Sequence, residues 1–129
     1  MLIAAFVSYV FHEQQALQIT FAAFSVLSVG ALSVLVFRKH DRKIQKREGY
    51  LIVALGWFLM ALSGLLPYGF TGAISSVSAG FFETMSGYTT TGATILNDIE
   101  ALPKGLLFWR SLTHWIGGMG IIVLAIAIL

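Results

Sequence analysis

The residues with the clearest capacity for chemistry lie in the stretch 87–94, which reads GYTTTGAT. It places Thr89, Thr90 and Thr91 directly before Gly92. Main-chain carbonyl and hydroxyl oxygens replace the hydration shell of a cation in ion filters, and glycine allows backbone angles and close approaches that other residues resist. The stretch therefore has the composition of a cation-coordinating loop. Three threonines alone favour an ordinary loop, so the interpretation depends on the segments on either side.

Groups that serve other kinds of chemistry are sparse. The chain has no cysteine, which excludes a disulfide framework, a thiolate metal site and a cysteine nucleophile. His12, His40 and His114 lie far apart without an acidic partner at helical spacing, whereas zinc and iron sites need clustered ligands. Gly-rich phosphate-binding motifs are missing as well, and the aromatic residues suit lipid contacts and packing. We therefore expect neither a zinc or iron site nor a cofactor.

The composition assigns the chain to a class before its elements are placed. Hydrophobic residues make up 57% of the 129 residues and charged residues 11%, more apolar material than a soluble domain of this size can bury. Residues 14–37 carry no charge and match the roughly 20 residues of a transmembrane helix. Residues 1–10 are apolar but cover only about half of a bilayer at about 1.5 Å per residue. We predict an all-α membrane protein that begins with a transmembrane hairpin, 1–37, whose first helix is truncated.

A basic connection follows this hairpin. Residues 38–48 contain six of the eight lysine and arginine residues of the chain. By the positive-inside rule, this connection faces the cytoplasm. Nucleic acid or anionic lipid also attracts such a run, but apolar spans on both sides make orientation the simpler explanation. The net charge of +2 is therefore no evidence for a nucleic-acid partner, and we expect none.

The remaining apolar segments predict a helix, a loop that enters and leaves on one side, and a second helix. The segment before the threonines is about 20 Å long as a helix, too short to cross, and Ser75 and Ser76 are suitable capping residues at its start. The polar, turn-rich segment 97–104 has the composition of an external loop. The predicted order is an outer helix at 49–70, a pore helix at 74–86, a filter at 87–94 and an inner helix at 105–129.

Placement between two crossings favours an ion filter over an ordinary loop. Backbone outside a helix at membrane depth is tolerated only where protein buries it or water lines it, because each unsatisfied carbonyl in lipid is costly. Carbonyl oxygens that face a cation are satisfied. The short helix also directs its partly negative C-terminal end at the loop, which favours cations over anions.

Two charged residues and a group of glycines accompany the loop as structural support. Glu83 falls in the pore helix and Arg110 near the outer end of the inner helix, and charges at such depth usually pair or reach water. We predict that they pair and stabilise the loop, with snorkelling of Arg110 to the interface as the alternative. Gly117, Gly118 and Gly120 suit a close approach between helices, with a hinge as the less common role.

Three motifs give the chain a family resemblance. They are ETMSGYTTTGAT at 83–94, the segment 108–125 with FWRS and WIGGMGIIVLA, and the shorter REGYLIV at 47–53. Together they resemble the first pore repeat of the Trk/Ktr/HKT potassium-transporter superfamily, and within it most of all the bacterial TrkH-type subunits. The resemblance is strong over 47–129 and looser over the leading hairpin.

The resemblance implies a function and a set of site residues. In that superfamily one chain carries four helix–loop–helix repeats around a single pore, and each filter loop contributes a glycine and neighbouring carbonyls to potassium coordination. By motif, Thr90 and Thr91 bind the ion, Thr89 lies beside them and Gly92 permits the backbone path. The potassium ion is the transported substrate, and neither catalysis nor a cofactor is implied. The implied setting is a lipid bilayer, the bacterial plasma (inner) membrane crossed several times, with a second copy of the chain and a cytosolic nucleotide-binding regulatory subunit as partners.

The chain contains one such loop where the superfamily has four. One quarter of a ring cannot coordinate an ion, and both ends fall within apolar segments, so we expect a fragment of a longer chain that supplies the remaining pore repeats. Three alternatives stay open: a homotetrameric two-helix-type cation channel subunit, a noncatalytic membrane scaffold or regulatory subunit, and, least favoured, an intramembrane hydrolase. The hydrolase would need Ser86 or Ser111 with His114 and Asp98, which form no recognisable nucleophile motif.

Overall fold

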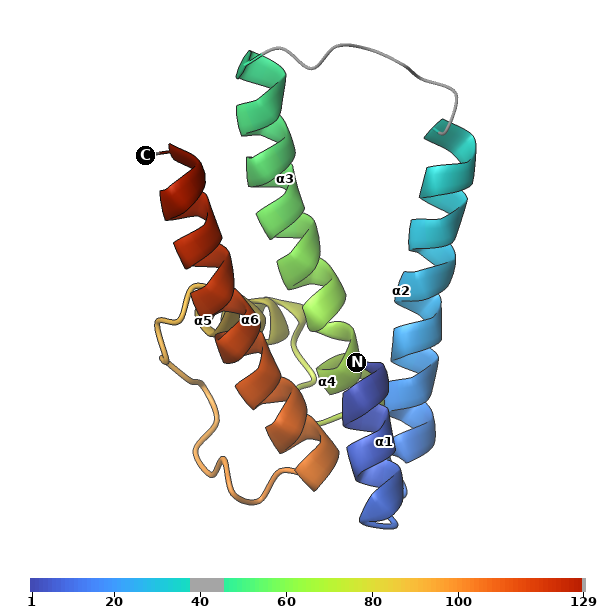
Figure 1. Cartoon of the computed structure of the whole chain (residues 1–129). Helices are drawn as coiled ribbons and strands as arrows, with labels where there is room; N and C mark the ends of the chain where they lie inside the picture. The colour runs from blue at the N-terminus through green and yellow to red at the C-terminus, as the bar shows by residue number, and fades with distance from the viewer. Residues whose placement is uncertain (38–45, 129) are drawn as a thin grey trace.

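The computed structural model describes residues 1–37 and 46–128 of the chain. Every regular element in these two ranges is a helix, in agreement with the predicted all-α class. Two helical segments, Ala16–Phe37 and Glu48–Thr71, are long and apolar enough to cross a membrane. The helices shown in Figure 1 are α1 (Leu2–Val10), α2 (Ala16–Phe37), α3 (Lys46–Gly64), α4 (Leu66–Thr71), α5 (Val77–Tyr88) and α6 (Lys104–Ile128).

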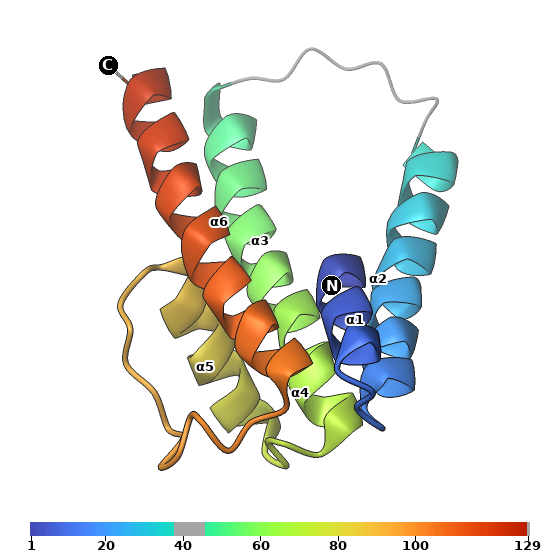
Figure 2. The same cartoon turned by 60° about the horizontal axis from the view of Figure 1, so that its bottom comes forward.

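The leading hairpin consists of α1 and α2. α1 packs against both α2 and α6, and it lies between them in Figure 1 and Figure 2. Its buried positions are Ala4, Ala5 and Ser8, which are small enough for neighbouring helices to approach closely. The basic connection that follows the hairpin was predicted at 38–48, and residues 38–45 lie outside the described part of the chain. Its cytoplasmic placement stays a prediction.

The predicted outer helix at 49–70 is divided into α3 and α4, with Leu65 between them. Pro67 lies in the first turn of α4, where its missing N–H removes a hydrogen bond that a continuous helix would need. The carbonyl of Gly64, the last residue of α3, accepts a hydrogen bond from the indole nitrogen of Trp109 at 3.0 Å. This bond ties the end of α3 to α6.

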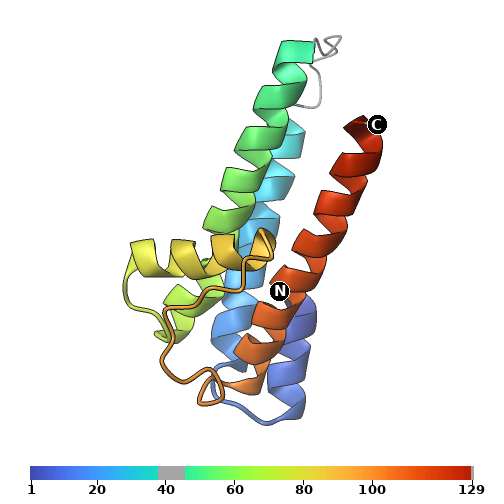
Figure 3. The same ribbon diagram turned by 90° about the vertical axis from the view of Figure 1, so that its left-hand side faces the viewer.

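α5 enters the bundle and the loop behind it returns on the same side. In Figure 3 α5 runs across α3, and its C-terminal end lies between α3 and α6, both of which it contacts. Residues 89–103 then run back to the end of the molecule where α4 lies, and α6 starts there (Figure 1). The order of helix, short helix, loop and helix is the predicted one.

The bounds of the short helix differ from the prediction of 74–86. α5 starts after Ser76, whose backbone is extended and whose hydroxyl bonds to Ser78 Oγ at 2.8 Å rather than capping the helix. At the other end the helix continues through Gly87 and Tyr88, two residues that were assigned to the filter. Both are buried, because their helical turn packs against α6. The loop proper therefore begins at Thr89.

A small apolar core holds the hairpin, α4 and α6 together. The rest of the bundle presents apolar side chains outward: Val36 is 71% exposed and Tyr50 is 78% exposed. Apolar faces of this extent suit contact with lipid or with further helices. The core residues are Ala4, Ala5, Ile19, Tyr68, Ile74, Leu102, Leu106 and Trp109.

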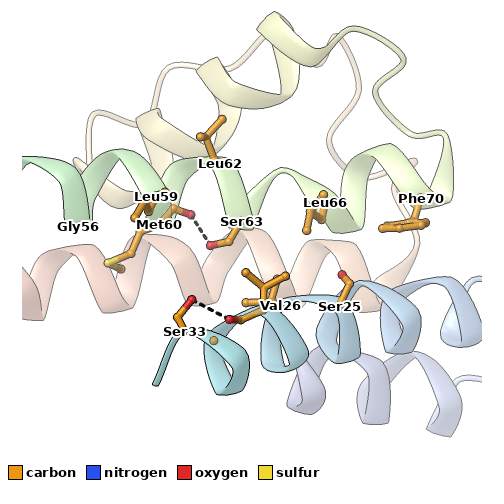
Figure 4. Close-up of a pocket in the computed structure, with 12 residues that line it drawn as sticks. Ser25, Val26, Ser33, Gly56, Leu59, Met60, Leu62, Ser63, Leu66 and Phe70 are labelled. Atoms are coloured by element: carbon orange, nitrogen blue, oxygen red, sulfur yellow. Dashed lines mark hydrogen bonds between the residues drawn. The ribbon is translucent and has the colours of Figure 1, made fainter. Parts of the chain in front are cut away.

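An apolar groove of about 630 Å³ lies between α2 and the α3–α4 segment. Figure 4 shows Val26 of α2 facing the side of the groove formed by Leu59 and Leu66. Serines in its wall already donate hydrogen bonds to carbonyls of their own helices, as Ser33 does to Val29 at 2.8 Å. All the lining residues belong to α2, α3 and α4, so the groove is separate from the loop after α5.

Candidate functional site

The loop after α5 starts with a tight turn built by main-chain hydrogen bonds. The amide of Thr90 donates to the Gly87 carbonyl at 3.0 Å, and the amide of Thr91 donates to the Ser86 carbonyl at 3.0 Å. Thr90 has a φ of 56° and Gly92 a φ of 77°. Glycine adopts this left-handed region without steric cost, whereas a β-branched residue does so only where its surroundings hold it there.

The left-handed backbone was predicted from the sequence for Gly92 but not for Thr90. Gly92 has the unusual backbone angle expected of it, but a methyl group there would meet no atom of the described residues within 4 Å. Its role within this chain is therefore conformational and does not depend on close packing. Nothing in the sequence indicated that Thr90 also adopts a left-handed conformation, because threonine rarely does.

The main-chain carbonyls of residues 89–92 are open to a partner from outside the described residues. Over the two described ranges, no hydrogen bond ends on any of these oxygens, and all four residues are exposed. Threonine hydroxyls stabilise the turn instead: Thr89 Oγ1 donates to the Met85 carbonyl at 2.8 Å and lies 2.8 Å from Thr91 Oγ1. The next carbonyl, that of Ala93, accepts a hydrogen bond of 2.6 Å from Ser86 Oγ.

The carboxylate of Glu83 connects α5, the far end of the loop and α6. It accepts hydrogen bonds from Thr94 Oγ1 at 2.9 and 3.0 Å and from the amide of Ile95 at 3.1 Å. Arg110 Nε lies 2.8 Å from Glu83 Oε1. The Glu83 side chain has no exposed surface, so these partners satisfy a charge that would otherwise be buried alone. The structure thus brings Glu83 and Arg110 together, and it adds Thr94 and Ile95 to the pair.

Glycines of α5 and α6 let these helices pack directly onto their neighbours. A methyl group on Gly117 would overlap the main-chain carbonyl of Tyr88, so α6 contacts the end of α5 with no side chain between them. A methyl group on Gly87 would lie 3.2 Å from Thr113 Cβ, and one on Gly120 would lie 3.6 Å from the ring of Trp57. These contacts favour close approach over a hinge as the role of Gly117.

Glu13 is a charged residue near α6 that the motifs did not identify. It lies in the turn between α1 and α2, and its carboxylate accepts hydrogen bonds from the main-chain amides of Lys104 and Gly105 and from Ser8 Oγ at 2.8 Å. Partial burial by itself raises the pKa of the Glu13 carboxyl, but these hydrogen bonds and the charge of Lys104 outweigh it, so the pKa lies below its usual value. A clue was available, because no residue just before α6 supplies a capping side chain.

The residues of the weaker hypotheses have other partners. Ser86 donates to Ala93 and Ser111 to Leu107, whereas His114 Nδ1 lies 2.9 Å from the Arg110 carbonyl. Asp98 accepts from the amides of its own turn. No serine, histidine and acid therefore form a triad among the described residues, and no group of three metal-binding side chains occurs there either.

The family of the chain follows from comparison with known proteins. Residues 14–129 match the family described as "TrkH: Cation transport protein". The chain belongs to the TrkH family. The matched range includes α5, the loop, Glu83 and Arg110, so the whole candidate site lies within the TrkH match. Membership in a family of transport proteins, together with two candidate spans, makes it a membrane protein.

Relatives of this TrkH-family chain are considerably longer. It is 39% identical over 130 residues to the Trk system potassium uptake protein TrkH of Escherichia coli K12. This match covers 100% of this chain and 27% of the relative. It is 45% identical over 104 residues to TrkH of Halomonas elongata, and this match covers 80% of this chain and 22% of the relative. It is 31% identical over 121 residues to the Trk system potassium uptake protein TrkG of Escherichia coli K12, and this match covers 92% of this chain and 25% of the relative. The chain thus spans about a quarter of the length of these curated relatives.

Proposed function

We propose that this chain takes part in potassium transport by supplying one of four parts of a selectivity filter. In this proposal the main-chain carbonyls around Thr90 and Thr91 replace part of the water shell of a dehydrated potassium ion. Thr89 lies beside them, and Gly92 permits the backbone path. Potassium is the transported substrate and moves down its electrochemical gradient, so the chain performs no covalent chemistry and needs no cofactor.

The observation that carries the proposal is that the exposed carbonyls of 89–92 follow the end of α5 directly, in a loop that is held at both ends. Those four carbonyls accept no hydrogen bond from the described residues, and the same is true of the carbonyls of 94–98. Only 89–92, however, lie between the end of α5 and the two bonds that hold the Ala93 carbonyl to Ser86 and the Thr94 hydroxyl to Glu83. Unpaired carbonyls inside a membrane are costly unless water or an ion satisfies them. A loop with stabilised flanks and free central carbonyls is suited to coordinating a cation.

The charges around the loop support a monovalent cation as the ligand. Glu83 is paired with Arg110, so its carboxylate is not free to attract an ion. Carbonyl dipoles and the negative end of α5 are then the main attraction, and carbonyl rings are typical of potassium filters, whereas rings of carboxylates serve other cation channels. The names of the TrkH and TrkG relatives, which are potassium uptake proteins, support the same ion.

The proposal places this chain in a larger assembly. Because one loop cannot surround an ion, three further pore repeats are proposed to come from the longer chain that the lengths of the relatives suggest. We further propose a multi-pass protein of the bacterial inner membrane that forms a homodimer and binds a cytosolic nucleotide-binding regulatory subunit. These partners rest on the family resemblance.

A pair of glycine substitutions tests the filter. Gly92 and Gly72 both have left-handed backbones, with φ of 77° and 71°, and a methyl group would meet nothing within 4 Å at either position. Alanine therefore imposes a similar backbone strain of about 1 kcal/mol at both sites, but only Gly92 lies in the loop. We expect Gly92→Ala in the full-length protein to lower potassium uptake and its discrimination against sodium, and Gly72→Ala to leave discrimination unchanged.

The readout is rubidium or potassium uptake by a potassium-requiring host, with sodium as competitor and with uptake normalised to the amount of protein in the membrane. Equal discrimination in Gly92→Ala, Gly72→Ala and the unmodified protein would remove the filter assignment.

A further inference from the structure

We propose that Glu13 is a positioning residue for the filter loop, acting from the leading hairpin through α6. The expected effect of Glu13 on transport rests on the proposed function, whereas its expected effect on the loop rests on geometry alone. Glu13 precedes the matched family range of 14–129 and lies 91 residues before Lys104 in the sequence. Its role depends on contacts that only the folded chain creates.

Glu13 binds the start of α6 directly. One carboxylate oxygen accepts from the amide of Lys104, and the other accepts from the amide of Gly105 at 3.1 Å and from Ser8 Oγ at 2.8 Å. The first amides of a helix have no partner within the helix, and a negative charge beside them is favourable. Glu13 thus provides from another element the cap that α6 lacks locally.

Close packing makes this contact rigid. A methyl group on Gly105 would lie 2.6 Å from Ser8 Cβ and 3.0 Å from both the Ala4 carbonyl and Ile19 Cδ1. Ser8, Ala4 and Ile19 are completely buried. The first turn of α6 therefore sits in a fitted position on the hairpin, and it cannot shift or rotate without losing either the carboxylate or these contacts.

The same helix then holds the filter loop at three levels. Arg110 pairs with Glu83, which holds Thr94 and Ile95. One turn further on, Thr113 packs against Gly87. About three turns beyond Gly105, Gly117 contacts the Tyr88 carbonyl, directly before Thr89. A helix is stiff over this distance, so the register that Glu13 sets at its start determines where these three contacts fall.

Hydrogen exchange of the full-length protein tests the inference without reference to transport. Within residues 89–95, four amides are hydrogen-bonded in the structure: those of Thr89, Thr90, Thr91 and Ile95. We expect Glu13→Ala to speed exchange by about fivefold at the start of α6 and also in the peptide that covers 89–95. Glu13→Gln, which retains one acceptor oxygen, should show the same pattern with smaller changes.

Two further variants make the test specific. Glu100→Gln is the matched control, because Glu100 is an exposed acidic residue in the loop before α6, and it should change neither region. Ser8→Ala removes only the hydroxyl that orients the carboxylate, and it provides a milder variant where Glu13→Ala fails to fold. Faster exchange confined to the start of α6, with residues 89–95 unchanged, would show that Glu13 is only a local cap and would overturn the proposal.

Transport provides the second readout. In the same full-length variants we expect Glu13→Ala to raise the apparent KM for potassium and to reduce discrimination against sodium by a few fold per molecule in the membrane, with Glu13→Gln between it and the unmodified protein. A variant that lowers only the amount of folded protein, at unchanged KM and discrimination, would contradict positioning. Absence of potassium uptake by the unmodified protein would count against the proposed function, whereas the exchange result would still decide the role of Glu13.

Discussion

Replacing Gly117 by alanine should disturb the filter loop, whereas the same change one residue later should not. At Gly117 an added methyl group would overlap the carbonyl of Tyr88, the last residue of α5. At Gly118 the nearest atom would be Thr90 Cγ2 at 3.8 Å, an ordinary van der Waals contact. Because both glycines lie inside α6, the two variants change helix propensity equally and differ only in what the methyl group meets.

The two substitutions are expected to change the free energy of unfolding in opposite directions. Alanine in place of glycine inside a helix stabilises by about 0.5–1 kcal/mol. An extra methyl group in a packed contact costs about 1–3 kcal/mol where its neighbour has to move, and the neighbour of Gly117 is main chain, which yields less easily than the end of a side chain. The balance is a net loss of up to about 2 kcal/mol for Gly117→Ala and a gain of up to about 1 kcal/mol for Gly118→Ala.

Thermal unfolding of the purified full-length protein and cation uptake together measure both consequences. We expect Gly117→Ala to unfold at a lower temperature and to discriminate less well between potassium and sodium, because the Tyr88 carbonyl is joined directly to Thr89. Gly118→Ala should unfold at the same or a higher temperature with normal discrimination. A hinge would be stiffened by alanine at either position, so equal impairment of transport in both variants would refute the packing argument.

Two further predictions concern the charged residues. Arg110→Glu alone should lower stability by about 3–5 kcal/mol, because it leaves Glu83 buried without its partner. The exchanged pair Glu83→Arg with Arg110→Glu should restore only part of the stability and uptake, since arginine cannot accept the hydrogen bonds from Thr94 and Ile95. A complete lack of recovery would argue against pairing. Glu13 has a pKa below its ordinary value of 4.5 in the folded protein, so its contribution to stability is present above about pH 4.5 and is lost as pH falls through the folded-state value. The unfolding temperature of the unmodified protein should therefore fall more steeply in acid than that of Glu13→Gln, and parallel curves would show that the carboxylate is not stabilised by its contacts.

Much of the architecture could be predicted because its causes are local in the sequence. An uncharged stretch of sufficient length predicts a spanning helix, and α2 begins within two residues of its predicted start. A segment too short to cross, followed by Gly92, predicted a helix that enters and a loop that returns. The pairing of Glu83 with Arg110 followed from the cost of a lone charge inside a membrane.

The features that were not predicted depend on contacts between distant segments. Glu13 and Lys104 are 91 residues apart, and no local pattern reveals that one caps the helix of the other. The extension of α5 through Tyr88 depends on Gly117, which permits the helix end to pack on α6. The division of the outer helix at Leu65 had a local signal in Pro67, but the predicted outer helix continued past it to residue 70.

The strain at Thr90 indicates how the loop keeps its shape. A threonine in the left-handed region costs about 1–3 kcal/mol. A neutral hydrogen bond contributes about 0.5–1.5 kcal/mol net, and one to a charged group about 1.5–3 kcal/mol. The main-chain bonds of Thr90 and Thr91 hold the turn itself. At its far end the bond from Ser86 to Ala93 alone covers only the lower part of the strain, whereas that bond together with those from Thr94 and Ile95 to Glu83 exceeds it. The conformation of the central carbonyls thus depends on the bonds to Glu83, and hence on Arg110 and on the position of α6 that carries it.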